Sequence, residues 1–264
     1  MKRFLTTYII MSLLMLALPA LQVSASSGGS YDHEQLMQRA EFLLNNYKET
    51  EALRIYEEVL ALSADNFEAL CKASLLHNRI GDRYSANDTR QMEHFSKAKD
   101  LATRAHGLNP TDAETNYLMA LSMSNLATVL GPKQRLEMTN QVKNYLDAAL
   151  ACRSDHAGAW HLMGRWQYKM ANLNFAEIAA SKMFFGGIAE KTTNSDAIQS
   201  LQKAIAISPQ NIRYYYDLAT IYQEMKEKEA CVNVLKEALT VNMETKEEYE
   251  LSRRCKIMLE DQAR

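Results

Sequence analysis

The chain has 264 residues, of which 47% are hydrophobic and 23% charged, so it can bury a sizeable core and is not a disordered polymer. Four prolines and nine glycines, among abundant Ala, Leu, Glu, Lys and Met, favour helix nearly everywhere. The formal net charge of −2 gives no electrostatic case for binding nucleic acid or an anionic membrane surface.

The first 25 residues have the pattern of an export signal. Lys2 and Arg3 give a basic start, and an apolar run extends over 8–21. Val23, Ser24 and Ala25 place small residues where a signal peptidase would cut. We therefore expect a cleaved signal peptide.

Cleavage near Ala25 divides the chain into a signal peptide over 1–25, a flexible mature N-terminus over 26–32 and one helical-repeat domain over 33–264. We expect export to a periplasm, with no stable membrane span after cleavage and a mature charge near −4. The alternative is an uncleaved N-terminal membrane anchor. The short apolar run and its interruption by Pro19 disfavour that anchor.

Five helical hairpins are predicted along the rest of the chain. In the tetratricopeptide template, small residues sit where the two helices of a hairpin approach closely, bulkier ones fill the space between hairpins, and Pro ends the second helix. The first unit illustrates the spacing, with apolar residues on both helices: Leu36, Ala40, Leu43, Ala52, Tyr56 and Val59. The five units start at His33, Phe67, Ala113, Ala157 and Ile212.

The fourth unit matches the template best. Trp160, Met163 and Gly164 occupy the template's Trp, Leu and Gly positions. On its second helix the template positions of Ala, Phe and Pro hold Ala197, Leu201 and Pro209.

The intervals between unit starts are 34, 46, 44 and 55 residues, against a template of about 34. We expect the excess residues to lie between the two helices of a hairpin. The longest insertion, 172–195, is apolar where a loop would be polar. It could extend the helix from Gly158 through about Phe185 as a long arm, and then either pack on the neighbouring unit or form a wall or lid over the binding groove.

A last helix from Lys246 to about Asp261 mixes a few apolar residues with many charges, as expected for a helix that caps the end of the stack. Strand signals are absent from the sequence. The predicted fold is an all-α, tetratricopeptide-like right-handed superhelix of about five helical hairpins with insertions, plus this C-terminal capping helix.

The cysteines are scattered and include no C-x-x-C pair. In an oxidising compartment they could form disulfides, but a core of this size needs none, so we expect small buried residues in helix contacts. Cys231 with Cys255 is the pair that stays open, because both fall on the last two or three helices.

Several segments resemble the regulator of microtubule dynamics family. They are Gly81-Asp82-Arg83, Lys97-Ala98-Lys99, Leu108-Asn109-Pro110, the run from His156 to Tyr168 followed by Ala171-Asn-Leu173, and Tyr215-Tyr-Asp-Leu-Ala219. The resemblance covers roughly 67–243. It implies an all-helical tetratricopeptide-like domain with a binding role, in a family whose animal members are associated with microtubules and organelle membranes. Together with the export signal, the chain resembles a signal-bearing bacterial branch of that family.

No catalytic or metal-binding pattern holds. Asp32-His33-Glu34 lacks the second His four residues on that a zinc helix of the H-E-x-x-H type requires. Gly131-Pro-Lys133 lacks the upstream Gly and the Ser or Thr of a phosphate loop. We predict no enzyme, no metal and no cofactor.

Binding is expected on the first helices of the hairpins, which line the concave face of such a stack. The helical period directs one stripe of each first helix into this groove, and the candidate residues are Asn78, Arg79, Tyr117, Asn125, His161, Arg165, Tyr168, Arg213, Tyr216 and Gln223. Arg, Lys, His and Tyr side chains suit a peptide carboxylate or an acidic extended segment.

Simpler roles exist for some of these side chains. His161 and Arg165, four residues apart, could pair with acidic neighbours on the stack. Trp160 and Trp166 are expected in the core.

The leading hypothesis is a non-catalytic scaffold that holds a protein or peptide in its concave groove. The alternative is a carrier of a small apolar or lipid ligand, in a cavity closed by the 172–195 insertion. A structural subunit of an envelope assembly is a third. The specificity is expected where Arg165 and Tyr168 face Phe184 and Phe185.

Overall fold

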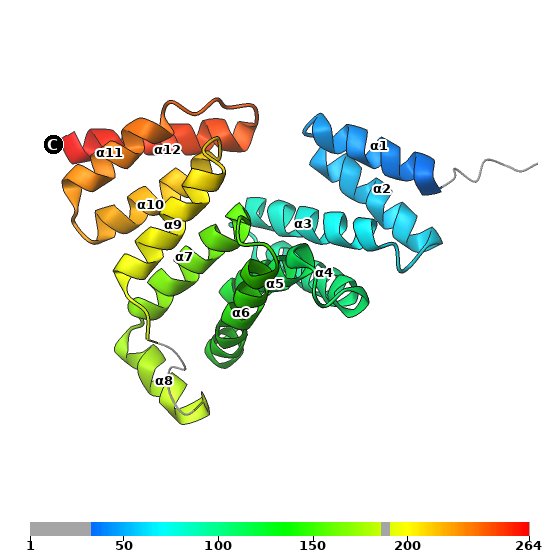
Figure 1. The fold of residues 1–264 in the computed structure, drawn as a ribbon, viewed down its shortest axis with the longest axis horizontal. Coiled ribbons are helices and arrows are strands. Elements are labelled where there is room, and N and C mark those ends of the chain that lie inside the picture. The colour runs from blue at the N-terminus through cyan, green and yellow to red at the C-terminus, as the bar shows by residue number, and fades with distance from the viewer. Residues whose placement is uncertain (1–32, 186–190, 264) are drawn as a thin grey trace, which may run out of the picture. The chain divides into compact units, whose positions relative to one another are not determined.

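The structure, a computed structural model, describes residues 33–185 and 191–263 (Figure 1). These residues form helices and no strand. The expected export signal, its cleavage near Ala25 and the mature N-terminus lie outside the described residues, and the predicted division into domains stays a prediction. The helices are α1 (His33–Asn45), α2 (Glu49–Leu62), α3 (Phe67–Arg83), α4 (Asp88–Leu108), α5 (Ala113–Val129), α6 (Pro132–Cys152), α7 (Ala157–Ala171), α8 (Phe175–Phe185), α9 (Asn194–Ile207), α10 (Ile212–Glu224), α11 (Lys228–Ala238) and α12 (Lys246–Ala263).

The helices pair as hairpins, and the predicted fold class is confirmed. α1 packs on α2, α3 on α4, α5 on α6, α7 on α9 and α10 on α11, while each hairpin also contacts the next. The first helix of every hairpin begins at the residue expected from the repeat register. α12 lies against α10 and α11, as a capping helix should, and buries Leu251, Cys255 and Met258 with them.

Side chains at the helix starts explain why the boundaries fall where they do. The carboxylate of Asp112 accepts a hydrogen bond from the backbone N–H of Thr115, and the Asn66 amide does the same for Ala69. Thr193 and Asp196 form a reciprocal capping box at the start of α9. Each cap satisfies a backbone donor that the helix itself leaves without a partner.

Gly164 sets how closely the two helices of the fourth hairpin approach. A Cβ placed there would lie 2.7 Å from Cγ of Leu201 and 2.9 Å from the carbonyl oxygen of Ala197 on α9. Ala197 and Leu201 are fully buried at this contact. The template glycine is therefore required by the contact between α7 and α9.

The excess residues of the second and third units lengthen helices instead of forming loops, so that expectation was wrong. α4 and α6 each have 21 residues, whereas α1 has 13 and α2 has 14. Only 84–87 and 130–131 separate the helices within these two hairpins. The extra residues contain no proline inside a helix, so nothing stops the helices from continuing.

The long arm expected from Gly158 to Phe185 is also wrong, because the chain breaks into two helices. α7 ends at Ala171, and a new helix starts after Asn174, whose side chain accepts a hydrogen bond from the backbone N–H of Glu177. In the other direction, the Glu177 carboxylate accepts from the N–H of Asn174. α8 packs against α6 of the preceding hairpin, which was one of the two placements considered.

The tryptophans differ in environment. Trp166 is buried and donates its indole N–H to the carbonyl oxygen of Thr139, 2.8 Å away, as expected for the core. Trp160 is only partly buried and lies beneath the ammonium group of Lys203, 4.1 Å from the ring centroid.

All four cysteines are free thiols in the structure. Cys71, Cys231 and Cys255 are buried, and Cys152 is exposed. Cys231 and Cys255 belong to one apolar cluster formed by α10, α11 and α12. None of the described helices combines the length and the apolar character needed to cross a bilayer.

Candidate binding face

Three arginines on the first helices of successive hairpins lie close enough to influence the same titratable groups. Arg79 is on α3, Arg165 on α7 and Arg213 on α10. Burial raises the pKa of Tyr117 on α5, and the charges of Arg79 and Arg165 oppose that rise. Burial also raises the pKa of Tyr214 on α10, against Arg79 and Arg213. These five residues, here called the arginine cluster, come from four different helices.

Two aspartates lie within this cluster. Loss of hydration raises the pKa of Asp82 at the end of α3, although Arg213 and Arg165 pull it down. Asp217 on α10 has a lowered pKa: burial alone would raise it, but a hydrogen bond with His161 and the charges of Arg165 and Arg213 outweigh burial. Of the two, Asp217 contacts an arginine directly, because its Oδ2 lies 3.8 Å from Nε of Arg165.

His161 on α7 contacts two residues of α10 next to the arginine cluster. Its Nε2 lies 2.7 Å from Oδ2 of Asp217, and its ring stacks on Tyr214 with centroids 4.5 Å apart. Burial lowers the pKa of His161, with Asp217 acting in the opposite direction. Arg165 is more loosely held, its Nε 3.8 Å from Asp217 Oδ2, and about half of its side chain is exposed. The pairing of His161 and Arg165 with an acidic neighbour, considered from the sequence, is what the structure shows.

Two residues at the start of α7 pack against the ring of Tyr117. Its ring lies 4.6 Å from the ring of His156, the residue that caps the start of α7. Gly158, in the first turn of α7, leaves room for it, since a Cβ there would lie 2.9 Å from Cζ of Tyr117. The ring is therefore an immobile part of the face formed by α5 and α7.

One edge of this face carries a polar network between the first hairpin and the start of α12. Glu49 on α2 pairs with Arg79, 2.8 Å away, and also with Arg83. Nε of Arg83 lies 2.8 Å from a carboxylate oxygen of Glu247. Tyr47 donates a hydrogen bond to Glu244. We call Tyr47, Glu49, Arg83, Glu244 and Glu247 the clasp.

Asn78 and Asn125 do not line the face, contrary to expectation. Both are buried, and the Asn125 amide donates to Asn78 Oδ1 at 3.0 Å, while Asn78 donates to the Ser122 hydroxyl at 2.8 Å. They lie late in their helices, where the lengthened α3 and α5 pack together. Their role is to join these helices through a satisfied buried network.

Tyr168, Tyr216 and Gln223 belong to other contacts. The Tyr168 hydroxyl donates to Glu224 at 2.7 Å, so this side chain faces α10 and not α8. Tyr216 and Gln223 line a separate depression of about 230 Å³ with Arg254, Ile257, Met258 and Asp261 of α12. The expected meeting of Arg165 and Tyr168 with Phe184 is therefore wrong, and the side chain of Phe185 lies outside the described residues.

Of the ten predicted residues, the structure brings together Arg79, Tyr117, His161, Arg165 and Arg213. Sequence reasoning missed Asp82, Tyr214 and Asp217. Asp82 and Asp217 both lie in segments that carry the family resemblance, and this was the available signal.

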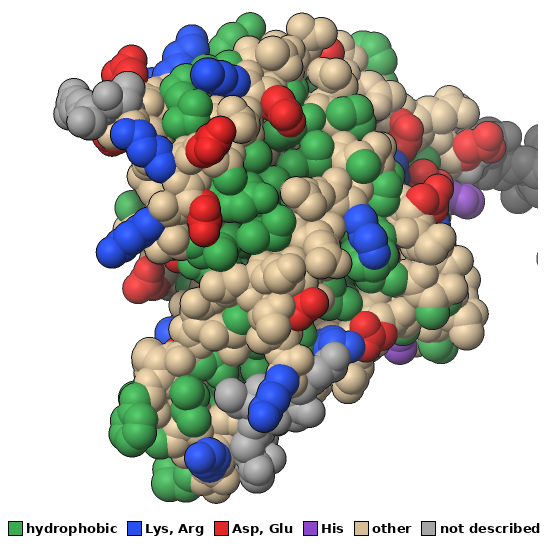
Figure 2. All heavy atoms as spheres, turned by 60° about the vertical axis from the view of Figure 1, so that its left-hand side comes forward, with side chains coloured by type: hydrophobic (Ala, Val, Ile, Leu, Met, Phe, Trp, Pro, Cys, Tyr) green, Lys and Arg blue, Asp and Glu red, His purple; other side chains and the backbone are tan. Residues whose placement is uncertain are grey.

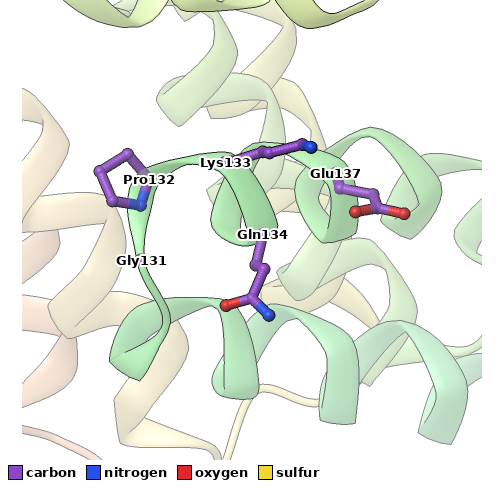
Figure 3. Close-up of a pocket in the computed structure, with 5 residues that line it drawn as sticks. All are labelled: Gly131, Pro132, Lys133, Gln134 and Glu137. Carbon is purple, nitrogen blue, oxygen red and sulfur yellow. The ribbon is translucent and has the colours of Figure 1, made fainter.

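A second depression, of about 510 Å³, lies at the start of α6 (Figure 3). Its lining comes from five residues at the start of α6 and just before it: Gly131, Pro132, Lys133, Gln134 and Glu137. Figure 3 shows Lys133 and Glu137 extending to one side of the helix, while Pro132 and Gln134 point elsewhere. This depression has no arrangement that would fix a ligand.

Solved structures support the fold. A thermophilic TPR protein from Thermus thermophilus matches with a TM-score of 0.62 at 14% identity, over 86% of this chain and 99% of that chain. PilW, described as a type IV pilus biogenesis factor, matches with a TM-score of 0.50 at 16% identity, over 88% of each chain.

Proteins with similar sequences are named regulators of microtubule dynamics. Human Regulator of microtubule dynamics protein 2 is 25% identical over 174 residues, which cover 64% of this chain and 42% of that protein, so the chain spans less than half of this relative. Regulator of microtubule dynamics protein 1 from Caenorhabditis elegans is 22% identical over 227 residues, covering 86% of this chain and 96% of that protein. The family model described as Regulator of microtubule dynamics protein 1-3 matches residues 36–263. This match shows that the chain belongs to the regulator of microtubule dynamics family.

Proposed function

We propose that the protein is a non-catalytic scaffold that binds a protein or peptide on the face formed by α3, α5, α7 and α10. The observation that carries the proposal is that three exposed arginines, Arg79, Arg165 and Arg213, lie on first helices that form one chain of contacts through α5. Guanidinium groups bind carboxylates through paired hydrogen bonds. The partner we propose therefore presents a carboxylate or an acidic segment.

The existing ion pairs do not prevent such binding. Arg79 pairs with Glu49 and Arg165 with Asp217, but about half of each arginine side chain is exposed. Their carboxylate partners are largely buried, Glu49 at 12% and Asp217 at 22% exposed, so these pairs stay in place. A guanidinium has five N–H donors, and a partner carboxylate can bind the donors on its exposed side. Asp217 orients Arg165, and it would also reject a partner with negative charge at the wrong place.

The spacing of the helices sets the length of the partner. The four first helices lie in successive contact, α3 with α5, α5 with α7 and α7 with α10. Three steps of about 8–10 Å between helix axes span about 24–30 Å, which is the length of roughly eight extended residues. An acidic peptide of about that length is the probe we choose.

The test is fluorescence anisotropy with a labelled octaglutamate peptide and, as a charge control, octalysine. We expect octaglutamate binding, with an affinity loss of about tenfold for Arg165→Ala or Arg213→Ala, since charge-assisted hydrogen bonds are worth roughly 1.5–3 kcal/mol each. Arg253→Ala is the matched control, because Arg253 is an exposed arginine on α12 paired locally with Glu250. Equal binding by all four proteins would contradict the proposal.

Purified tubulin is a second probe, because the relatives are named as regulators of microtubule dynamics. If the wild type captures tubulin and Arg165→Ala does not, the face that carries Arg165 would be a tubulin-binding surface.

We also propose that the chain is exported and acts in a periplasm, on the strength of the N-terminal sequence alone. A fusion of alkaline phosphatase to residue Arg264 tests this, since the enzyme becomes active only after export. An inactive fusion would contradict it.

The lipid-carrier alternative gains no support from the described residues. The cavity it requires would be closed by the 172–195 insertion, yet Phe175 and Met183 of α8 are exposed to solvent. The two depressions described above are lined by residues outside the insertion.

A further inference from the structure

α8 exposes a stripe of apolar residues to water. Phe175, Ala179 and Met183 recur every four residues and form one stripe along the helix. Phe175 is 87% exposed and Met183 72% exposed, while Ser181 on the opposite side is buried. A surface helix of a globular protein normally has the reverse polarity, so this arrangement requires an explanation.

Specific contacts hold α8 in this orientation. Glu177 is turned inward, where it caps the helix at Asn174 and lies 3.7 Å from the ammonium group of Lys169 on α7. Phe184 is turned toward α6, with the ammonium group of Lys133 5.6 Å from its ring centroid. Glu177 and Phe184 thus face the protein, and the stripe of Phe175 and Met183 faces outward.

A positively charged residue lies beside the stripe. Lys182 is exposed on the same side of α8 as Phe175, whereas Lys133 of α6 lies next to Phe184 on the side that faces α6. The one acidic residue of α8, Glu177, is on the inward side. In Figure 2 the lowest projection, at the place of α8 in Figure 1, carries hydrophobic side chains with Lys or Arg beside them and no Asp or Glu among them in this view.

We propose that the outward face of α8 inserts at the boundary between headgroups and acyl chains of a bilayer that contains anionic lipid. Exposed Phe and Met next to Lys is the pattern of an interfacial helix, whose lysines reach the headgroups while the apolar side chains enter the acyl region. The negative net charge of the whole chain argued against this from the sequence. At physiological salt, however, charges more than about 8 Å from the bilayer are largely screened. The attraction to anionic lipid therefore depends on Lys182 beside the stripe more than on the net charge of the chain.

The size of the stripe favours a bilayer over a protein partner. Its two large side chains offer on the order of a few hundred Å², since aromatic side chains bury about 150–250 Å² each. A stable protein interface needs about 800 Å² from each partner. A bilayer has no such minimum, because insertion strength simply follows buried apolar area and charge.

The test is flotation of the full chain with phosphatidylcholine vesicles that do or do not contain phosphatidylglycerol. We expect the double variant Phe175→Asp/Met183→Asp to reduce the vesicle-bound fraction about tenfold or more, because two buried apolar side chains are lost. Lys182→Glu should weaken binding to the phosphatidylglycerol vesicles and change binding to pure phosphatidylcholine much less. The apolar run at 8–21 is present in every variant, so its own contribution is common to all of them.

The matched control is Phe42→Asp/Leu62→Asp, which places the same charges at two exposed apolar residues of α1 and α2. This control should bind as the wild type does. Equal binding by the α8 variant and the control would overturn the proposal. So would sedimentation velocity showing that the α8 variant only abolishes self-association in the absence of lipid, which would make the stripe an interface between copies.

Discussion

Replacing Gly164 by alanine should destabilise the protein, although alanine is the better helix former. The added Cβ would meet Leu201 Cγ at 2.7 Å and the carbonyl oxygen of Ala197 at 2.9 Å. A side chain can turn aside, but a backbone oxygen in a packed helix cannot, so α7 and α9 must separate by several tenths of an ångström. Overpacking of this kind costs about 2–3 kcal/mol. The gain in helix propensity returns only about 1 kcal/mol.

Gly107→Ala is the matched control. Gly107 lies in the last turn of α4, where a Cβ would meet nothing within 4 Å. The same substitution there adds only the propensity gain of about 0.5–1 kcal/mol.

Thermal unfolding followed by circular dichroism separates the two variants. For a folded unit of this size 1 kcal/mol shifts Tm by about 2–4 °C. We expect Gly164→Ala to lower Tm by roughly 2–8 °C and Gly107→Ala to raise it slightly. If both variants shift Tm upward, the close approach of α7 and α9 does not exist and the reasoning is refuted.

Three further predictions concern pH, thiols and ions. Burial lowers the pKa of His77 to about 4, whereas an unfolded histidine titrates near 6.5, so the unfolded chain binds more protons between these values and stability should fall as the pH drops through them. His77→Gln should flatten this slope in urea titrations, and an unchanged slope would assign it to His94 or to other groups. Ellman's reagent should label one thiol per native chain, Cys152, and four in urea; two in urea would reveal a disulfide. Arg83→Met should lose about 1 kcal/mol at low salt, less in 1 M NaCl, because it removes the partner of Glu247; a loss independent of salt would contradict an ionic clasp.

The hairpins could be predicted because packing restricts the sequence at regular positions. Ala40, Ala120, Ala149, Gly164 and Ala219 lie where two helices approach, and a larger residue would force them apart. The register of these small residues fixed the starts of all five first helices correctly. Any sequence that forms this stack of hairpins must place small residues at these positions in each repeat.

Helix lengths could not be predicted in the same way. A template of fixed period assigns extra residues to loops, but residues without glycine or proline continue a helix as readily as they leave it. In the second and third units the extra residues lengthened α4 and α6. Asn78 and Asn125 meet in the core where α3 and α5, each of 17 residues, pack together, and this changed their predicted role from binding to packing.

The candidate binding face was only half predicted, for a related reason. A stripe of inward positions identifies side chains that point toward a face, but it does not tell which of them find partners there. Asp217 lies outside the predicted stripe, yet it reaches His161 because Tyr214 stacks on the same ring and brings α7 and α10 together. A pairing of this kind depends on residues of two helices at once. It produces no periodic pattern in the sequence of either helix from which it could be predicted.

Residues that helix packing requires differ from residues that packing leaves free to vary. Small residues between helices are required by any stack of this kind, and so they carry no information about a ligand. The exposed arginines of the binding face and the outward stripe of α8 are not required for packing, and an exposed Phe175 costs solubility without adding to the core. Features that packing does not demand are where function is expected. For this reason Arg165 and Arg213 on one face, and Phe175 and Met183 on the other, are the residues to change first.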